Sequence, residues 1–225
     1  MSTLHVYREL EQGTDEWLSA RCGLLTASVV GQLITGKTLA VSKSDTARAV
    51  MDTLVAERLT GHIDPVHVTA DMERGNDEEP FARDLYAEHT GVAVGEVGLM
   101  VRTIDGHRLG YSPDGLVGDD GLIEIKSRRP KKHLRTVLTD SVPGENMAQL
   151  QAGLLVSGRE WIDYVSFSAG MQLYTTRVTP DPRWQDAITA ALIEFETYAA
   201  NATRLYQHTT RGMPTCPRIE TDIVI

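Results

Sequence analysis

Two carboxylates and one lysine lie close together in residues 112–126, which read SPDGLVGDDGLIEIK. Asp114 precedes a polar stretch at 118–121 that is typical of a turn, and Glu124 and Lys126 follow it on a segment typical of a β-strand. Because side chains alternate between the faces of a strand, Glu124 and Lys126 are expected on one face and the neighbouring isoleucines on the other, in the core. If residues 118–121 form a hairpin turn, Asp114 comes within reach of the same face, so that the three charged groups converge at a sheet edge.

This combination of side chains suits metal-assisted hydrolysis of a phosphodiester. Carboxylate oxygens are the ligands that Mg²⁺ prefers, and the ion usually keeps several waters for substrate or nucleophile. The metal lowers the pKa of a bound water and neutralises charge that develops on the phosphate. A lysine beside it orients the attacking water and stabilises the charged transition state. The same pattern also fits a hairpin with a solvated polar face, so other residues must decide between the two.

A further carboxylate can come from residues 72–91, MERGNDEEPFARDLYAEHTG, which are predicted to be helical at least from Phe81 onward. Glu78 and Glu79 are both candidates, and their spacing alone does not choose between them. Pro80 disfavours helical backbone at the residue before it. The helix is therefore expected either to begin at this proline, at its first position, or to be kinked there.

Residues 20–34, ARCGLLTASVVGQLI, offer a candidate phosphate site. If Thr26 caps a helix, Ser28 lies in the first turn, where unpaired backbone N–H groups and the helix dipole attract anions. Arg21 would add a forked donor that matches a phosphate. The alternative is an ordinary helix start with a surface arginine.

Two glutamines on the helix predicted for residues 145–158 are further candidates. Gln149 and Gln151 lie two positions apart, about 200° around a helix, so only one of them can face a given site. The residue types do not say which one.

Residues 31–38, GQLITGKT, satisfy the P-loop pattern G-x-x-x-x-G-K-T. A nucleotide-binding loop of this kind needs a buried strand before it and a helix that opens at Lys37. No convincing apolar strand ending in an aspartate is available to hold the magnesium ion. Nucleotide binding at residues 31–38 is therefore the weaker interpretation.

The elements that must position these residues are helices on either side of a central run of strands. Helices are predicted at 44–61, with Ser44 as N-cap and Gly61 as stop, at 145–158 and from Pro182 to about Tyr206. Strands are predicted at 92–104, 122–126 and 161–168. This order indicates an α/β fold with a central mixed β-sheet flanked by helices.

Composition limits the class of protein further. The chain has 225 residues, which fits one domain with a substantial core. Its net charge of −9 argues, taken alone, against nucleic-acid binding, but residues 126–135 hold six Lys or Arg in ten positions and form a patch that can meet phosphates. Cys22 and Cys216 form neither a metal-type pair nor a disulfide framework. With no apolar run of membrane-spanning length and no signal peptide, a cytoplasmic protein without a membrane association is expected.

Four segments, in this order and with this spacing, resemble the lambda-type phage exonucleases, also called YqaJ-type viral recombinases, of the PD-(D/E)xK nuclease superfamily. These segments are EQGTDEWLSARCGLLTAS, RGNDEEPFARDLY, SPDGLVGDDGLIEIK and NMAQLQAGLLVSG. The resemblance extends from about Glu11 to about Tyr174. It implies a restriction-endonuclease-like α/β core, with residues 1–225 forming a single nuclease domain.

The resemblance also implies a role for each candidate residue. Residues of the metal and catalytic centre are implied to be Asp114, Glu124 and Glu79 as metal-binding acids, Ile125 as a further ligand through its carbonyl, and Lys126 as the catalytic lysine. A grip on the 5′-phosphate of the substrate strand is implied for Arg21, Ser28 and Gln149. The helical acid is thus expected to be Glu79, and the glutamine at the site to be Gln149.

The activity implied by the resemblance is a Mg²⁺-dependent, ATP-independent 5′→3′ exonuclease, with Mn²⁺ as a possible substitute. It would act on linear double-stranded DNA with 5′-phosphorylated ends and leave 3′ single-stranded overhangs for phage-type recombination. A ring-shaped homotrimer and a single-strand annealing protein are the implied partners, and the host cytoplasm is the implied location if a phage or prophage encodes the chain. The alternatives are a non-catalytic DNA-end-binding protein of the same fold and, less favoured, a P-loop NTPase using residues 31–38.

Overall fold

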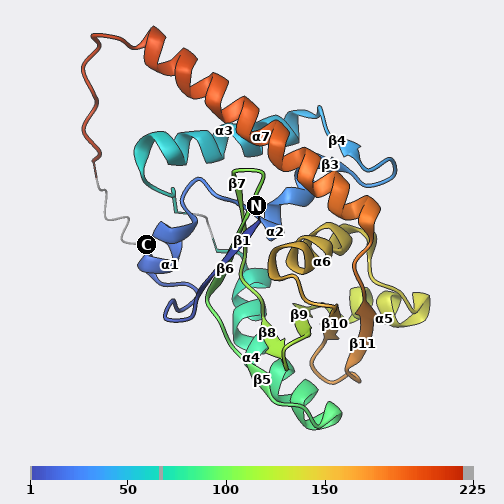
Figure 1. The fold of residues 1–225 in the computed structure, drawn as a ribbon. Helices are drawn as coiled ribbons and strands as arrows, with labels where there is room; N and C mark the ends of the chain where they lie inside the picture. Colours follow the sequence, from blue (N-terminus) through green and yellow to red (C-terminus); the bar gives the residue numbers. More distant parts are fainter. Residues whose placement is uncertain (1, 66–67, 220–225) are drawn as a thin grey trace.

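Two mixed β-sheets form the centre of the computed structural model, which describes residues 2–65 and 68–219 (Figure 1). One sheet has the strand order β1-β6-β7-β2, the other has the order β11-β10-β9-β8-β5, and β3 and β4 form a small separate hairpin. The pairs β2–β7 and β9–β10 are parallel, whereas the other pairs are antiparallel. The strands are β1 (Thr3–Tyr7), β2 (Leu25–Thr26), β3 (Ile34–Thr35), β4 (Ala40–Val41), β5 (Val94–Gly95), β6 (Leu99–Ile104), β7 (His107–Tyr111), β8 (Gly115–Val117), β9 (Gly121–Ser127), β10 (Trp161–Phe167) and β11 (Tyr174–Val178).

Helices cover both faces of the second sheet. The helices are α1 (Asp15–Arg21), α2 (Ala27–Val30), α3 (Asp45–Thr60), α4 (Ala70–Thr90), α5 (Pro130–Thr139), α6 (Gly144–Ser157) and α7 (Pro182–Thr209), with a 3-10 turn at Gly31–Leu33. Figure 1 shows α7 lying beside α3 and above α6, while α4 passes near β8 and β9. The α/β class with mixed sheets flanked by helices is therefore confirmed, although the strands form two sheets and not one.

Strand β9 is buried on both faces, which places its polar residues inside the molecule. Leu122 packs into the large core cluster with residues of α6 and α7, whereas Ile123 and Ile125 pack with Ala82 and Tyr86 of α4. The isoleucines thus lie in the core as predicted. β9 pairs with β10 from Gly121 to Ser127 but with β8 only from Gly121 to Ile123, so Glu124 and Lys126 lie beyond the β8 pairing, as expected of a site at a sheet edge.

Several predicted helix boundaries agree with the structure. Ser44 caps α3 by accepting a hydrogen bond from the backbone N–H of Ala47, and Gly61 ends this helix in the left-handed conformation at φ 65°. Glycine adopts that conformation without the steric penalty that a Cβ brings. The helices predicted at 145–158 and from Pro182 also form, as α6 and α7.

Two predicted elements differ from the structure. The stretch 92–104 is not one strand but two, β5 and β6, which belong to different sheets. The chain between them passes so close to another segment that a Cβ at Gly98 would lie 1.9 Å from the carbonyl oxygen of Leu10. The acidic helix α4 begins at Ala70 with Thr69 as its cap, so that Pro80 lies inside it and does not start it. Of the two expectations for Pro80, a helix that starts at the proline is wrong, whereas helical backbone on both sides of the proline is what the structure shows.

The P-loop interpretation is wrong. Residues 31–38 form a 3-10 turn, the short strand β3 and the turn that leads to β4. No helix opens at Lys37, which is exposed in the turn of this hairpin. The backbone arrangement that cradles a nucleotide phosphate is therefore not formed there.

Within the described ranges, no helix is both long enough and apolar enough to cross a membrane.

Candidate active site

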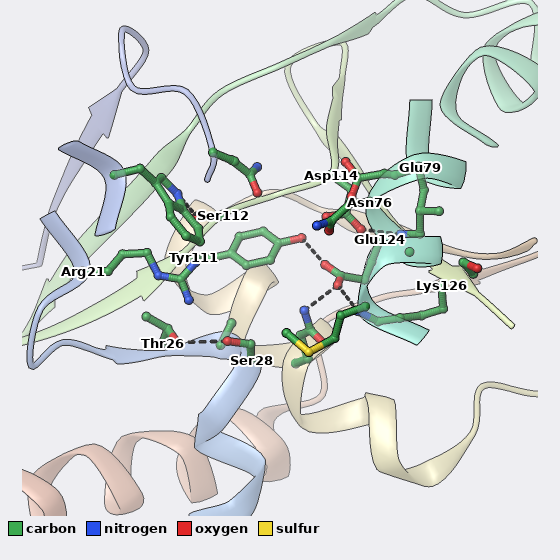
Figure 2. Close-up of a pocket in the computed structure, with 18 of the residues that line it drawn as sticks. Arg21, Thr26, Ser28, Asn76, Glu79, Tyr111, Ser112, Asp114, Glu124 and Lys126 are labelled. Carbon is green, nitrogen blue, oxygen red and sulfur yellow. Dashed lines mark hydrogen bonds and ion pairs between the residues drawn. The ribbon is translucent and has the colours of Figure 1, made fainter. Parts of the chain in front are cut away.

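All the predicted site residues line one pocket, of about 340 Å³ (Figure 2). They are Arg21, Ser28, Glu79, Asp114, Glu124, Ile125, Lys126 and Gln149. These residues come from α1, α2, α4, β9, α6 and the connection between β7 and β8. Segments distant in the sequence thus bring acidic, basic and amide side chains to a single cavity.

Glu124 lies at the centre of this pocket and is 1% exposed. Its Oε2 accepts a hydrogen bond from the Tyr111 hydroxyl at 3.0 Å, and its Oε1 accepts one from Nζ of Lys126 at 2.7 Å. Nε2 of Gln149 also donates to Oε1. Every oxygen of this buried carboxylate is therefore partnered, which offsets the free energy that burying its charge requires.

Asp114 lies opposite Glu124 because of the β8–β9 register. Gly115 pairs with Ile123, and Asp114 comes directly before Gly115. Oδ2 of Asp114 accepts a hydrogen bond of 2.6 Å from the backbone N–H of Ile125. Burial, and then repulsion by Glu124, raise the pKa of Asp114 well above its ordinary value.

The carbonyl of Ile125 faces the same side. The β8–β9 pairing ends at Gly115 and Ile123, and the N–H of Ile125 bonds the Asp114 side chain instead. In a strand the N–H and C=O of a residue point to the same side. The backbone of β9 therefore offers an oxygen beside the Asp114 carboxylate.

Glu79 brings the third carboxylate from α4. Its Oε1 accepts a hydrogen bond of 2.6 Å from Nη2 of Arg83, one turn further along the helix. Burial raises the pKa of Glu79, the charge of Arg83 lowers it, and the charge of Glu124 raises it, with an upward shift as the result. The neighbouring Glu78 instead accepts a hydrogen bond from Ser127 and does not line the pocket.

The two glutamines of α6 have different surroundings. Gln149 contacts Glu124 in the pocket, as described above. Gln151 is fully buried elsewhere: its Nε2 donates to the carbonyl of Thr179 and its Oε1 accepts from the N–H of Asp181, both at 2.8 Å. Gln151 thus joins α6 to the start of α7, and of the two glutamines Gln149 lines the pocket.

Lys126 is held as a cation. Burial by itself would lower the pKa of its ammonium group, but the carboxylates of Glu124 and Asp114 raise it, and the combined shift is upward. A lysine in this state is a charge stabiliser and a hydrogen-bond donor, and not a proton acceptor, at neutral pH.

The donor set of this pocket fits a divalent metal ion. Three carboxylates and a backbone carbonyl provide hard oxygen ligands, and a cation among them would relieve the repulsion that raises the pKa of Asp114. In the present arrangement the Glu124 and Glu79 carboxylates are engaged by protein donors. Within residues 2–65 and 68–219, no three His, Cys, Asp or Glu side chains are grouped closely enough to hold a metal ion as they stand.

The other end of the pocket is suited to an anion. The Arg21 guanidinium lies over the Trp17 ring, 3.9 Å from its centroid. Burial lowers the pKa of Arg21 to about 10, against the opposing charge of Glu57, so Arg21 remains charged at neutral pH. Ser28 lies nearby, with its Oγ 3.1 Å from Oγ1 of Thr26. Figure 2 shows Arg21 and Lys126 on opposite sides of Glu124.

Several other pocket residues were missed from the sequence. Nε1 of Trp17 donates to Oγ of Ser112 at 3.0 Å, which ties α1 to the segment before Asp114. Tyr111 is buried and bonded to Glu124. Ser112 could have been found from its place two residues before Asp114, on the same side of an extended chain. Tyr111 carries no such signal, because an aromatic residue at a strand end is typical of an ordinary core.

Comparisons with known proteins agree with this geometry. A model of the YqaJ-like viral recombinase domain matches residues 16–160, more than half of the chain. The chain belongs to the YqaJ-like viral recombinase family. This family member is similar to the crystal structure of an alkaline exonuclease (LHK-Exo) from Laribacter hongkongensis, with 35% identity, 87% of this chain and 100% of that chain covered, and a TM-score of 0.74. The same enzyme in complex with dAMP matches with 33% identity, coverage of 89% and 100%, and a TM-score of 0.78.

A more distant structure supports the fold alone. It is a phage-related exonuclease from Haemophilus somnus 129PT, with 16% identity, coverage of 81% of this YqaJ-like chain and 96% of that chain, and a TM-score of 0.63. No curated protein matches this YqaJ-like chain in sequence. The fold is thus the restriction-endonuclease-like fold of alkaline exonucleases, and homology to these enzymes makes the YqaJ-like protein a nuclease.

Proposed function

We propose that the chain is a Mg²⁺-dependent, ATP-independent 5′→3′ exonuclease that degrades one strand of linear double-stranded DNA from a 5′-phosphorylated end. Its product would be a duplex with a 3′ single-stranded overhang, the substrate for recombination by strand annealing. The observation that carries the proposal is that one pocket holds a carboxylate centre and, beside it, a partly enclosed arginine with Ser28 and Gln149. One cavity would thus serve both the hydrolysis and the recognition of a strand end.

The residues divide into two groups by what they can do. Asp114, Glu124, Glu79 and the Ile125 carbonyl would hold Mg²⁺ or, in its place, Mn²⁺. When bound, such an ion lowers the pKa of a coordinated water and neutralises charge on the phosphate. Lys126, kept protonated by Glu124, would donate to the phosphate oxygens as negative charge develops on them.

Arg21 and Ser28 would bind the terminal 5′-phosphate. A guanidinium matches a phosphate with two parallel hydrogen bonds, and the Trp17 ring restricts the orientation of this one. Gln149 contacts Glu124 directly, so it would connect the phosphate grip with the catalytic centre. Binding of the terminal phosphate at a fixed place sets which phosphodiester lies next to Lys126, and this gives the direction of digestion.

The relatives support DNA as the substrate. The Laribacter hongkongensis protein is an alkaline exonuclease whose structure was determined in complex with dAMP, a deoxynucleoside monophosphate. A compound of this kind is what an exonuclease releases from DNA, one nucleotide at a time. We propose that the present chain likewise releases deoxynucleoside monophosphates from DNA, because the match covers the whole of that enzyme.

We also propose that residues 1–225 act as one nuclease domain, assembled as a ring-shaped homotrimer that works with a single-strand annealing protein. The recombinase family supports this proposal. A ring accommodates the acidic balance of the chain, since its outer surface can be acidic while a basic channel faces DNA. Light scattering would read three copies of the 24.8 kDa chain.

The experiment that tests the proposed function uses a linear duplex with a 5′-phosphate on one end and a 5′-hydroxyl on the other. Wild type and Arg21→Ala are incubated with it in Mg²⁺ or in EDTA, without ATP, and each strand is followed by its own label. We expect wild type to digest the 5′-phosphorylated strand faster than the 5′-hydroxyl strand, and only in Mg²⁺. In Arg21→Ala the ratio of these two rates should fall by about tenfold or more. Equal attack on both ends by wild type would contradict the phosphate grip, and binding of ends without digestion would favour a non-catalytic end-binding protein.

A further inference from the structure

Two arginines share one exposed aspartate at the rim of the pocket. Asp71, in the first turn of α4, lines the pocket, and its Oδ1 accepts hydrogen bonds from Nη1 of Arg74 at 2.6 Å and from Nε of Arg129 at 2.9 Å. The side chains of Asp71 and Arg129 are 55% and 69% exposed. Solvated ion pairs of this kind are weak, so another anion can take the place of Asp71. We call Asp71, Arg74 and Arg129 the rim cluster.

The rim cluster is connected to the catalytic strand. Nε of Arg74 donates to Oγ of Ser127 at 3.1 Å. Ser127 follows Lys126 on β9 and lines the same pocket. Arg129 is the N-cap residue of α5, only three positions beyond Lys126. The two guanidinium groups are therefore tied to the end of the strand that carries Lys126, and to Asp71 at the pocket.

The order of groups across the pocket suggests what these arginines bind. Arg21 and Lys126 lie on opposite sides of Glu124 in Figure 2, and the rim cluster adjoins the Lys126 side through Ser127. A strand whose terminal phosphate is at Arg21 and whose scissile phosphate is beside Glu124 must leave toward the rim. We infer that Arg74 and Arg129 bind the backbone phosphates of the DNA strand next to the bond that is cut, and that Asp71 occupies this anion site when DNA is absent. This inference rests on the proposed function.

The charge around the rim favours a polyanion as the ligand. The chain as a whole carries −9, yet residues 126–135 contain six Lys or Arg. The guanidinium groups of Arg74 and Arg129 both bond the carboxylate of Asp71. A further carboxylate, that of Glu78, lies 3.8 Å from Arg74, but it accepts a hydrogen bond from Ser127. A guanidinium group can donate two parallel hydrogen bonds to two oxygens of one phosphate. Here both guanidinium groups donate to the same oxygen, Oδ1 of Asp71, so a phosphate would offer them more acceptors.

The test measures the affinity of the full chain for a 5′-phosphorylated duplex by fluorescence anisotropy, in EDTA and at several NaCl concentrations. We expect Arg129→Ala to weaken binding about tenfold and to reduce the slope of log Kd against log salt by about 1. Arg129→Lys should keep most of the slope. Asp71→Asn, which retains the shape but removes the competing charge, should tighten binding roughly threefold. Arg183→Ala is the matched control, since Arg183 forms an exposed pair with Asp181 at 3.3 Å outside the pocket.

Two results would overturn the inference. One is unchanged affinity and slope in both Arg129→Ala and Asp71→Asn. The other is weaker binding in Asp71→Asn, which would make Asp71 a support for the arginines and not their competitor. Digestion of the same duplex by wild type in Mg²⁺ is measured in parallel. If wild type digests the duplex but Arg129→Ala and Asp71→Asn bind DNA as wild type does, only the rim site is refuted. If the two variants bind DNA as predicted but wild type does not digest the duplex, only the nuclease function is refuted.

Discussion

The hydroxyl of Tyr111 donates a 3.0 Å hydrogen bond to Oε2 of Glu124, and each of these residues is only 1% exposed. The two residues belong to different sheets, because Tyr111 ends β7 and Glu124 lies on β9. The bond therefore joins the sheets at the pocket and orients the central carboxylate. With Oε2 held in this way, Lys126 and Gln149 converge on Oε1.

Replacement Tyr111→Phe should loosen this carboxylate while keeping the ring in the core. Loss of a residue that orients a metal ligand typically weakens metal affinity by about 10- to 100-fold. We expect the Mg²⁺ concentration for half-maximal digestion to rise by about tenfold, and the free energy of unfolding to fall by about 1–3 kcal/mol because a buried acceptor loses its donor. Tyr174→Phe is the control, since its hydroxyl bonds Asp140 at the surface. An unchanged Mg²⁺ requirement in Tyr111→Phe would show that the bond does not position Glu124.

The Tyr111 ring packs against Gly153 of α6, where a larger residue would leave no room for it. A Cβ on Gly153 would lie 2.8 Å from Cζ of Tyr111, closer than real contacts allow. Gly153→Ala should displace the ring, lower the free energy of unfolding by about 1–3 kcal/mol and slow digestion. Gly144→Ala, in the same helix, meets nothing within 4 Å and should have neither effect. Thermal unfolding and digestion rates of both variants check this, and equal stability of the two would contradict it.

Some of this site follows from sequence, whereas other parts depend on tertiary packing. The place of Asp114 opposite Glu124 follows from a short turn and the two-residue period of strands. The choice of Glu79 over Glu78 and of Gln149 over Gln151 could not be made from local pattern, because each choice depends on which elements lie beside the helix. The Tyr111–Glu124 bond depends on where two sheets meet, and no local pattern encodes that.

The Asp114 carboxylate should destabilise the metal-free protein. Its pKa is raised in the folded state, mainly by burial, so the folded state binds its proton more tightly than the unfolded state does. Stability from this group is therefore present at low pH and is lost as pH rises from about 4, the unfolded pKa, toward the raised folded pKa.

Asp114→Asn removes this charge, and its side-chain oxygen can still accept from the Ile125 N–H. In EDTA at pH 7 we expect it to raise stability on the order of 1 kcal/mol, or about 2–4 °C in Tm, with a smaller gain near pH 4. Added Mg²⁺ should raise the Tm of wild type but not of the variant. Thermal unfolding across this pH range provides the measurement. A variant that is less stable than wild type in EDTA at pH 7 would contradict the conclusion that the charge of Asp114 is unfavourable in the metal-free protein.

The most direct test of the central claim, that the pocket around Glu124 is a metal-dependent hydrolytic centre, is the release of nucleotides from a uniformly labelled linear duplex. Wild type, Lys126→Ala and the control Arg183→Ala are compared in Mg²⁺, with DNA affinity measured in EDTA. The account predicts release by wild type and Arg183→Ala, and release about 10²- to 10³-fold slower in Lys126→Ala with similar DNA affinity. Release by Lys126→Ala at the wild-type rate would contradict the account.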